Sequence, residues 1–280
     1  MRFWLIAVAS FLLISQSPEE SRVANATTST WVVSPQGSFT TIQQALEQAS
    51  DGDTVLVRPG IYQGPLVVEK SVELVGENWP VIDGGGKGMV VSLAAPAIHF
   101  TGFEVRGSGS EPDRDHAGIM LSAPDILVEN NRLSDVLFGI FVAQADRAIV
   151  RRNDITSKAE YEIARKGDSI RIWYSQDVVV EENLVHDSRD LVAWYSSNMV
   201  FRNNRILNGR YGVHLMYSDN AVISGNRIQD NAVGIYVMYS SEVSLIGNDI
   251  RRQRGPSGYA LGFKDADNVL AQNNLLVDNG

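Results

Sequence analysis

The sequence repeats an asparagine at an interval of about 22 residues, and no other feature constrains the fold as strongly. Seven asparagines, each followed two positions later by an apolar residue, stand 22, 30, 21, 22, 22 and 26 residues apart. Inserts at 158–167 and 252–258 account for the two long intervals. Such a period predicts a solenoid in which each repeat is one coil. The seven are Asn131, Asn153, Asn183, Asn204, Asn226, Asn248 and Asn274.

A second row keeps this period: the dipeptide Tyr-Ser recurs at Tyr174, Tyr195, Tyr217 and Tyr239. The segment before each dipeptide alternates inward and outward positions, as in 213–217 (VHLMY), which is the period of a β-strand. A coil of 21–22 residues fits three short strands and three turns, and successive coils stack about 4.8 Å apart. We therefore predict an all-β fold, a right-handed single-stranded parallel β-helix.

The asparagine row is predicted to be structural. An asparagine that points inward at a turn would leave a buried amide without hydrogen bonds. If the side chains stack from coil to coil, each amide can bond to the next along the axis. We therefore assign the seven asparagines to a ladder and not to catalysis.

The two ends of the stack differ. Residues 40–49 place apolar residues at 42, 45, 46 and 49, on one face of a helix, and Thr40 with Gln43 would form a capping box. This helix is expected to cap the N-terminal end, where open strand edges would invite aggregation. No such cap follows Asn274, so we expect either further coils or a partner that covers this edge.

Residues 1–26 are predicted to be a signal peptide. Arg2 precedes an apolar run over 3–15, which is short for a membrane span, and 24–26 (ANA) fits a cleavage site. An uncleaved anchor is the alternative, and the absence of cysteine excludes a lipid-anchored cysteine. The predicted organisation is a signal peptide (1–26), an N-terminal segment with the capping helix (27–53) and the β-helix (54–280). The net charge of −9 argues against a nucleic-acid partner.

Several stretches resemble one family. Residues 53–62 (DTVLVRPGIY), 81–86 (VIDGGG) and 98–103 (IHFTGF) are typical of it but are shared by many carbohydrate-active β-helices. The specific stretches are 210–218 (RYGVHLMYS) and 233–240 (VGIYVMYS). Together they resemble the periplasmic NosD-type proteins of nitrous-oxide-reductase maturation, although Leu191 stands where that family tends to have glycine. The resemblance implies a non-catalytic periplasmic protein that works with the membrane subunit of an ABC transporter and a copper chaperone.

The same stretches contain candidate metal ligands. Because Val213 and Leu215 point inward, alternation turns His214 and Met216 outward, and Met238 is expected beside Met216 on the next coil. Two thioethers and an imidazole are soft enough to hold Cu(I). The alternative is a Met and Trp surface that contacts a protein, since methionine is common at binding surfaces.

Two further classes of protein stay open. A polysaccharide lyase, hydrolase or epimerase would need paired carboxylates, for which Asp168, Asp187, Asp190 and Asp219 are candidates roughly one coil apart. None belongs to a recognisable catalytic motif, and Asp168 with Arg171 is the best remnant of a carbohydrate cleft. A non-catalytic carbohydrate-binding or adhesin scaffold is the third reading. The prediction is a protein without catalytic residues and with a candidate copper site at His214, Met216 and Met238.

Overall fold

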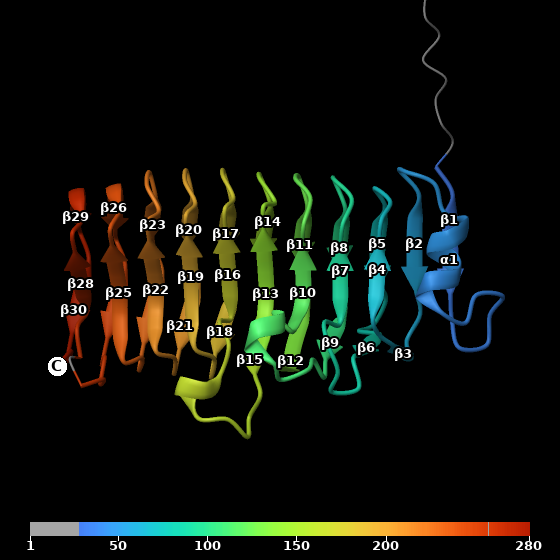
Figure 1. The fold of residues 1–280 in the computed structure, drawn as a ribbon, viewed down its shortest axis with the longest axis horizontal. Coiled ribbons are helices and arrows are strands. Elements are labelled where there is room, and N and C mark those ends of the chain that lie inside the picture. The colour runs from blue at the N-terminus through green and yellow to red at the C-terminus, as the bar shows by residue number, and fades with distance from the viewer. Residues whose placement is uncertain (1–27, 257) are drawn as a thin grey trace, which may run out of the picture.

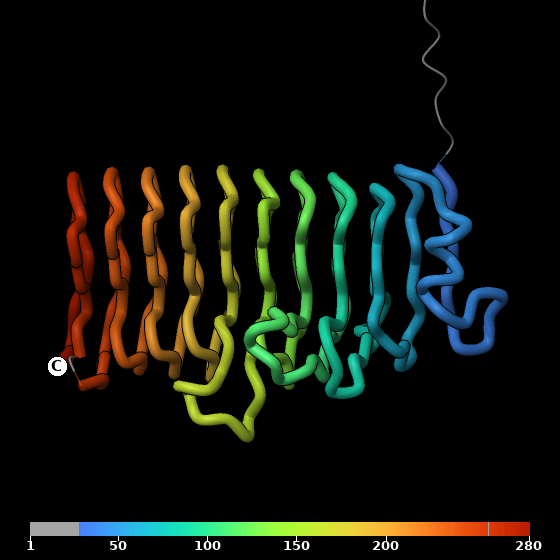
Figure 2. The backbone as a smooth tube through the Cα atoms, viewed as in Figure 1, coloured from blue at the N-terminus to red at the C-terminus, as the bar shows by residue number. Residues whose placement is uncertain are grey.

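The chain winds into a right-handed parallel β-helix, as the repeat predicts (Figure 1). The structure, a computed structural model, describes residues 28–256 and 258–280. Within these residues the coils form three parallel sheets of 11, 10 and 9 strands, here called sheets A, B and C. The backbone trace shows the coils as a row of separate rungs along one axis (Figure 2). Every named strand pair is parallel, with its register fixed by the coil period.

The strands are short and recur in a fixed order around each coil. Sheet A contains β1 (Thr30–Val33), β2 (Thr54–Val57), β5 (Glu73–Gly76), β8 (His99–Thr101), β11 (Leu127–Glu129), β14 (Ile149–Arg151), β17 (Val179–Glu181), β20 (Val200–Arg202), β23 (Val222–Ser224), β26 (Ser241–Ile246) and β29 (Asp267–Gln272). Sheet B contains β3 (Ile61–Gln63), β6 (Val81–Asp83), β9 (Glu104–Arg106), β12 (Arg132–Val136), β15 (Asp154–Ser157), β18 (Leu184–His186), β21 (Arg205–Leu207), β24 (Arg227–Gln229), β27 (Asp249–Arg251) and β30 (Leu275–Val277). Sheet C contains β4 (Leu66–Val68), β7 (Val91–Leu93), β10 (Ala117–Leu121), β13 (Phe138–Ala143), β16 (Ile170–Trp173), β19 (Asp190–Trp194), β22 (Tyr211–Met216), β25 (Val233–Met238) and β28 (Leu261–Lys264).

The core is a column of apolar side chains inside the three sheets. Alternate residues of each strand point inward, so Val213 and Leu215 are fully buried whereas Met216 is not. Phe100 and Phe103 fill the column nearer the N-terminal end, with their rings stacked at a centroid distance of 4.6 Å. Burial of this apolar surface is the main force that holds the coils together.

The asparagine ladder is confirmed. The Nδ2 group of Asn183 donates to Oδ1 of Asn204 at 3.0 Å, and the backbone N–H of Asn183 donates to the same oxygen at 3.0 Å. The same pair of bonds joins each asparagine to the next, from Asn131 to Asn274. A shorter second ladder was not predicted. In it the backbone N–H of Asn231 donates to Gln253, whose own N–H donates to Asn279.

The N-terminal cap is present, but its register was predicted one residue too early. Helix α1 (Ile42–Gln48) begins after Thr41, and the capping box joins Thr41 to Gln44 instead of Thr40 to Gln43. The side-chain oxygen of Gln44 accepts the backbone N–H groups of Thr40 and Thr41. Strand β1, which precedes the helix and pairs with β2, was also not predicted.

Two further features lie outside the regular coils or at their ends. Short 3-10 turns at η1 (Pro112–Arg114) and η2 (Ile163–Arg165) interrupt two of the loops. In the last coil Phe263, Leu270 and Leu275 are half-exposed.

The predicted signal peptide lies outside the described residues. Among those that are described, no helix has the length and apolar character needed to cross a bilayer.

Candidate functional site

The outward side of sheet C carries a row of large side chains in register. Trp173 pairs with Trp194, Trp194 with Met216, and Met216 with Met238, each one coil from the next. The prediction that Met216 and Met238 lie side by side on adjacent coils is therefore confirmed. Trp173 is the most exposed member, and the other three are half-buried.

His214 points away from the core, as alternation predicts, yet it is only 6% exposed. Two tyrosines cover it. The ring centroid of Tyr211 lies 4.9 Å from that of His214, and the centroid of Tyr236 on the next coil lies 6.0 Å away. Strand alternation indicates the face on which a side chain lies, but it does not show whether neighbours close over that side chain.

The His214 imidazole contacts a thioether on one side and a carboxylate on the other. Its Nε2 lies 3.3 Å from Sδ of Met238, and its Nδ1 lies 3.9 Å from Oδ2 of Asp190. Burial lowers the pKa of His214 to about 4, and the charge of Arg210 adds to this effect. Asp190 does not reverse the shift, because Arg210 neutralises its charge at close range. At neutral pH the imidazole is therefore uncharged.

Two nitrogen atoms in this region have no hydrogen-bond partner. They are Nδ1 of His214 and Nε1 of Trp194, and they are the only such buried side-chain atoms in 28–256 and 258–280. An unsatisfied buried polar atom is uncommon in folded proteins and marks a place where a ligand or another polar group fits.

His214, Met216 and Met238 form a group here called the His-Met cluster. Beside it lies a network of buried carboxylates and arginines, which was not predicted. Asp168 is fully buried and accepts from Nε of Arg171 at 2.9 Å and from Nε of Arg189 at 3.0 Å. Asp190 is bound by Arg210 and also accepts from the backbone of Tyr211. The signal was available in the sequence, since Arg189 and Arg210 each follow one of these aspartates by about one coil.

Each of the four candidate catalytic carboxylates is bound by a neighbouring group. Asp168 and Asp190 each form an ion pair with arginine, so guanidinium groups occupy their oxygen atoms. Asp187 pairs with His186 on a half-exposed turn, and Asp219 accepts from the backbone of Ser241.

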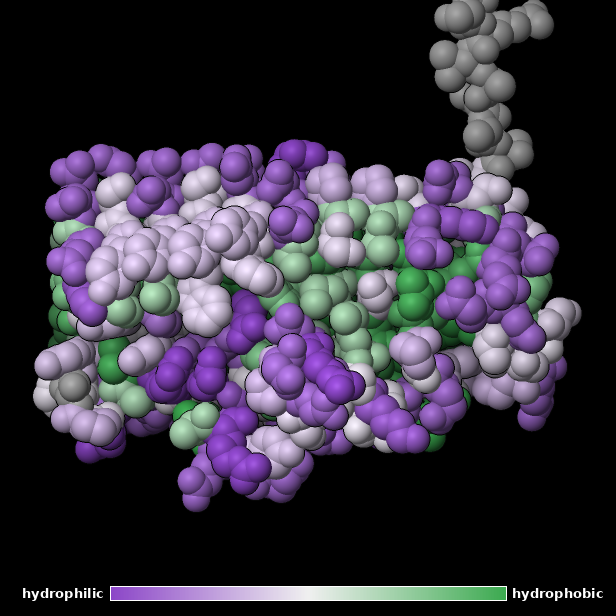
Figure 3. All heavy atoms as spheres, viewed as in Figure 1, coloured by the Kyte–Doolittle hydropathy of each residue, from purple (hydrophilic) through white to green (hydrophobic). Residues whose placement is uncertain are grey.

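The recurring Tyr-Ser dipeptide forms two ladders at one turn. Each serine hydroxyl accepts a backbone N–H from the preceding coil, as Ser218 does from Ser196 at 3.3 Å. The tyrosines point outward and stack, with centroid distances of 5.0, 5.1 and 4.8 Å along Tyr174, Tyr195, Tyr217 and Tyr239. In Figure 3 weakly coloured side chains form a band across the coils of β16–β25, and strongly hydrophilic ones gather between this band and the insert.

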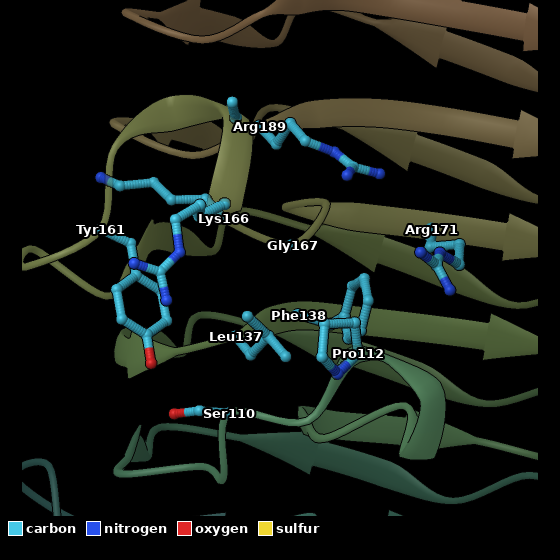
Figure 4. Close-up of a pocket in the computed structure, with 11 residues that line it drawn as sticks. Ser110, Pro112, Leu137, Phe138, Tyr161, Lys166, Gly167, Arg171 and Arg189 are labelled. Atoms are coloured by element: carbon cyan, nitrogen blue, oxygen red, sulfur yellow. The ribbon is translucent and has the colours of Figure 1, made fainter.

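A cavity of about 310 Å³ opens where the insert 158–167 folds back against sheet C (Figure 4). Gly167 allows this close approach, because a Cβ atom there would lie 2.4 Å from the backbone oxygen of Leu137. Arg171 and Arg189 line one part of the cavity, and Tyr161 of the insert lies opposite Arg171. In the described part of the chain, no group of three or more His, Asp or Glu side chains could hold a metal ion.

The fold and this face together define a β-helix protein with an outward row of tryptophan and methionine side chains along one sheet. Residues 100–276 match the family described as the right-handed β-helix region, and the chain belongs to that family. Among curated proteins it is similar to the probable ABC transporter binding protein NosD of Pseudomonas aeruginosa, with 28% identity over 133 residues. The protein of the same description from Stutzerimonas stutzeri is 29% identical over 133 residues. The resemblance to NosD-type proteins is confirmed over this stretch.

These matches cover part of each protein. Each match covers 47% of this chain. The matched stretch is 31% of the Pseudomonas aeruginosa protein and 30% of the Stutzerimonas stutzeri protein. Among solved structures, the chain resembles a polygalacturonase from Erwinia carotovora ssp. carotovora, with a TM-score of 0.61 and 13% identity over 89% of this chain and 95% of the other. A family 28 exopolygalacturonase from Yersinia enterocolitica gives 0.64 and 11% over 90% and 66%. At 13% and 11% identity, the similarity to these two structures establishes a shared fold alone.

Proposed function

We propose that this protein is an exported, non-catalytic accessory protein that handles copper in the maturation of nitrous-oxide reductase. The confirmed resemblance to NosD-type proteins supports this role, and the description of the relatives points to an ABC transporter as a partner. The protein would act in the periplasm and would associate with the membrane through that transporter alone. A copper chaperone would deliver the ion as cargo.

The observation that carries the proposal is the contact between His214 and Met238. Metal–nitrogen and metal–sulfur bonds of about 2.0 and 2.3 Å at a tetrahedral angle place the two ligand atoms about 3.5 Å apart. The observed separation of Nε2 and Sδ is 3.3 Å, and Met216 lies in register beside Met238. Thioether and imidazole ligands select Cu(I) over harder ions.

The second nitrogen of His214 fits the same role. A metal on Nε2 would move the imidazole proton to Nδ1, which has no partner and lies 3.9 Å from the Asp190 carboxylate. Metal-binding histidines commonly donate their other N–H to a carboxylate, which orients the ring. Arg210 holds Asp190 in place for this purpose. The low pKa of His214, about 4, keeps Nε2 free of a competing proton at neutral pH.

The tyrosine ladder supplies a surface on which a copper donor could dock. Three of its side chains, Tyr174, Tyr195 and Tyr217, are about half-exposed, Tyr239 is less exposed, and the ladder borders the row that ends in Met216 and Met238. Exposed aromatic rings with polar tips are enriched at protein interfaces. A donor seated there would release its ion next to the two thioethers.

An anaerobic Cu(I) titration against a competing chelator tests the proposal. We expect wild-type protein to bind one Cu(I) and the double variant Met216→Leu/Met238→Leu to bind it about 100-fold more weakly, or about 3 kcal/mol. Met120→Leu is the matched control, because Met120 also lies on the outward side of sheet C but outside the cluster. Absence of binding in the wild type, or equal binding in all three proteins, would refute a copper site here.

A further inference from the structure

The cavity beside the insert 158–167 is rich in positive charge. Four cationic side chains line it and no carboxylate does: Arg165, Lys166, Arg171 and Arg189. The two aspartates that contact this group, Asp168 and Asp115, pair with Arg171 and Arg189. Within 28–256 and 258–280, neither Arg165 nor Lys166 has a carboxylate within ion-pair distance.

Lys166 makes this excess of charge unusual, because it is only 6% exposed. Its ammonium donates to the backbone oxygen of Asp187 at 2.7 Å and has no anionic partner among the described residues. Buried charges in proteins are normally paired. A cluster of this kind is favourable when an anion occupies the cavity, since the anion then compensates the cations at short range.

The arginines on the sheet side of the cavity are held in place before any ligand arrives. The guanidinium carbon of Arg171 lies 4.1 Å from the centroid of the Phe138 ring, and its Nε and Nη1 atoms donate to Asp168 and Asp115. Arg189 donates to Asp168. A guanidinium has five N–H donors, so both arginines keep donors to offer the oxygen atoms of a ligand. Fixed donors lose little side-chain entropy on binding.

The remaining lining suits a small molecule with both polar groups and a nonpolar face. Pro112 supplies exposed apolar surface, the almost fully buried Leu137 and Phe138 add little, and Ser110 and Tyr161 supply hydroxyl groups (Figure 4). Arg165 lies 4.9 Å from the centroid of the Tyr161 ring. A volume of about 310 Å³ stands at the lower end of the range of about 300–1,000 Å³ for ligand pockets. The occupant is therefore the size of a single sugar unit.

We infer that this cavity binds a small hydroxylated carboxylate of the sugar-acid class, with its carboxylate on Arg165 at the Tyr161 end of the cavity and its other oxygen atoms toward the free donors of Arg171 and Arg189. The hydroxyl groups would bond to Ser110 and Tyr161, and the C–H face would lie on the exposed ring of Pro112. This binding needs no catalytic group and is independent of copper, because none of the cavity residues belongs to the His-Met cluster.

Titration of the purified protein with galacturonate and with galactose, followed by protein NMR in the presence of a copper chelator, tests the inference. The two probes differ in their acidic group alone. We expect a Kd of about 1 mM for galacturonate, as suits a ligand of this size, and at least tenfold weaker binding of galactose. Chemical-shift changes should centre on residues of the insert.

The variant Arg165→Gln should weaken galacturonate binding about tenfold, because it removes one charge-assisted hydrogen bond. Arg165 is exposed, so the change should leave folding intact. Arg227→Gln is the control, since Arg227 is equally exposed but lies on sheet B away from the cavity. Equal affinity for the two sugars, no effect of Arg165→Gln, or no binding of galacturonate would each overturn the assignment. None of these results bears on copper binding.

Discussion

His214 shows how burial changes what one residue can do. In the unfolded chain its pKa is near 6.5, and in the folded protein burial and Arg210 lower the pKa to about 4. Between these values the unfolded state binds more protons than the folded state, so stability falls as the pH drops. The side chains that face the imidazole are Asp190, Arg210 and, through their charges, Asp168 and Arg189.

This shift predicts a specific acid sensitivity. Between pH 7 and pH 4.5 the protonation of His214 in the unfolded chain should remove about 2 kcal/mol of stability, and His214→Gln should remove that part of the pH dependence. Urea unfolding of both proteins at the two pH values measures the difference. His186→Gln is the control, because the half-exposed His186 sits between two carboxylates. Parallel pH profiles for wild type and His214→Gln would show that the imidazole is not desolvated as described.

At the scale of elements, the asparagine ladder sets the geometry of one turn in every coil. Asn204 accepts the backbone and side-chain N–H groups of Asn183 and donates to Asn226 and to the backbone oxygen of Val180. Its removal would leave several buried polar groups unsatisfied at once.

We therefore expect Asn204→Ala to lower the free energy of unfolding by about 3 kcal/mol. Asn274→Ala should cost about 1 kcal/mol, because Asn274 lies at the end of the ladder and is partly exposed. Urea denaturation followed by far-ultraviolet circular dichroism gives both values. Equal losses at the two positions would contradict a ladder whose strength depends on burial.

The tyrosine ladder is a second repeated element, and its backbone conformation is unusual. Tyr217 adopts a φ of 52°, in the left-handed region where bulky residues are rare. The same position is Gln144 one coil before the ladder and Asp265 one coil after it, with φ values of 53° and 48°. Tyrosine is thus not needed for the turn itself. We therefore attribute the role of the rings to the surface that they form.

Tyr217→Asn tests this interpretation. The change removes two stacked contacts, each worth about 0.5–1.5 kcal/mol, and relieves about 1 kcal/mol of backbone strain. We expect a net loss of about 1 kcal/mol in thermal or urea unfolding, together with loss of partner docking. Gln144→Asn, at the same turn without a stacked ring, should change stability by less than about 0.5 kcal/mol. A loss of several kcal/mol in Tyr217→Asn would assign the ladder to folding instead.

What the sequence could predict depended on whether a feature repeats. The coil period, the inward Val213 and Leu215, the asparagine ladder and the pairing of Met216 with Met238 all follow from one period and strand alternation. Features that occur once were harder to predict.

The covering of His214 by Tyr211 and Tyr236 depends on side-chain packing that alternation does not encode. The pairing of Asp168 with Arg189 and the cavity behind the insert depend on how a nonrepeating loop folds back. The capping helix was recognised from its apolar face, but its first residue was misplaced because Thr40 and Thr41 are equally good caps by composition.

At the scale of the whole molecule, a stack of identical coils must be closed at its ends. Helix α1 buries Ile42 and Leu46 over the first coils and so covers apolar surface that would otherwise face water. The last described coil carries the half-exposed Phe263 and Leu275. Because strand edges and exposed apolar ends favour association between molecules, we expect the covering of these ends to limit self-association.

Leu46→Asp should therefore convert the protein from a species of constant mass into one whose mass rises with concentration. A charge at this buried position would detach the helix from the first coils and expose the core residues beneath it. Size-exclusion chromatography with light scattering over a range of concentrations measures the change. Gln43→Asp adds the same charge on the exposed face of the same helix and should behave like the wild type, which also corrects for any association through the last coil. If Leu46→Asp kept the wild-type mass at every concentration, helix α1 would not be needed to prevent association at the N-terminal end. That protection would then have to come from strand β1 itself.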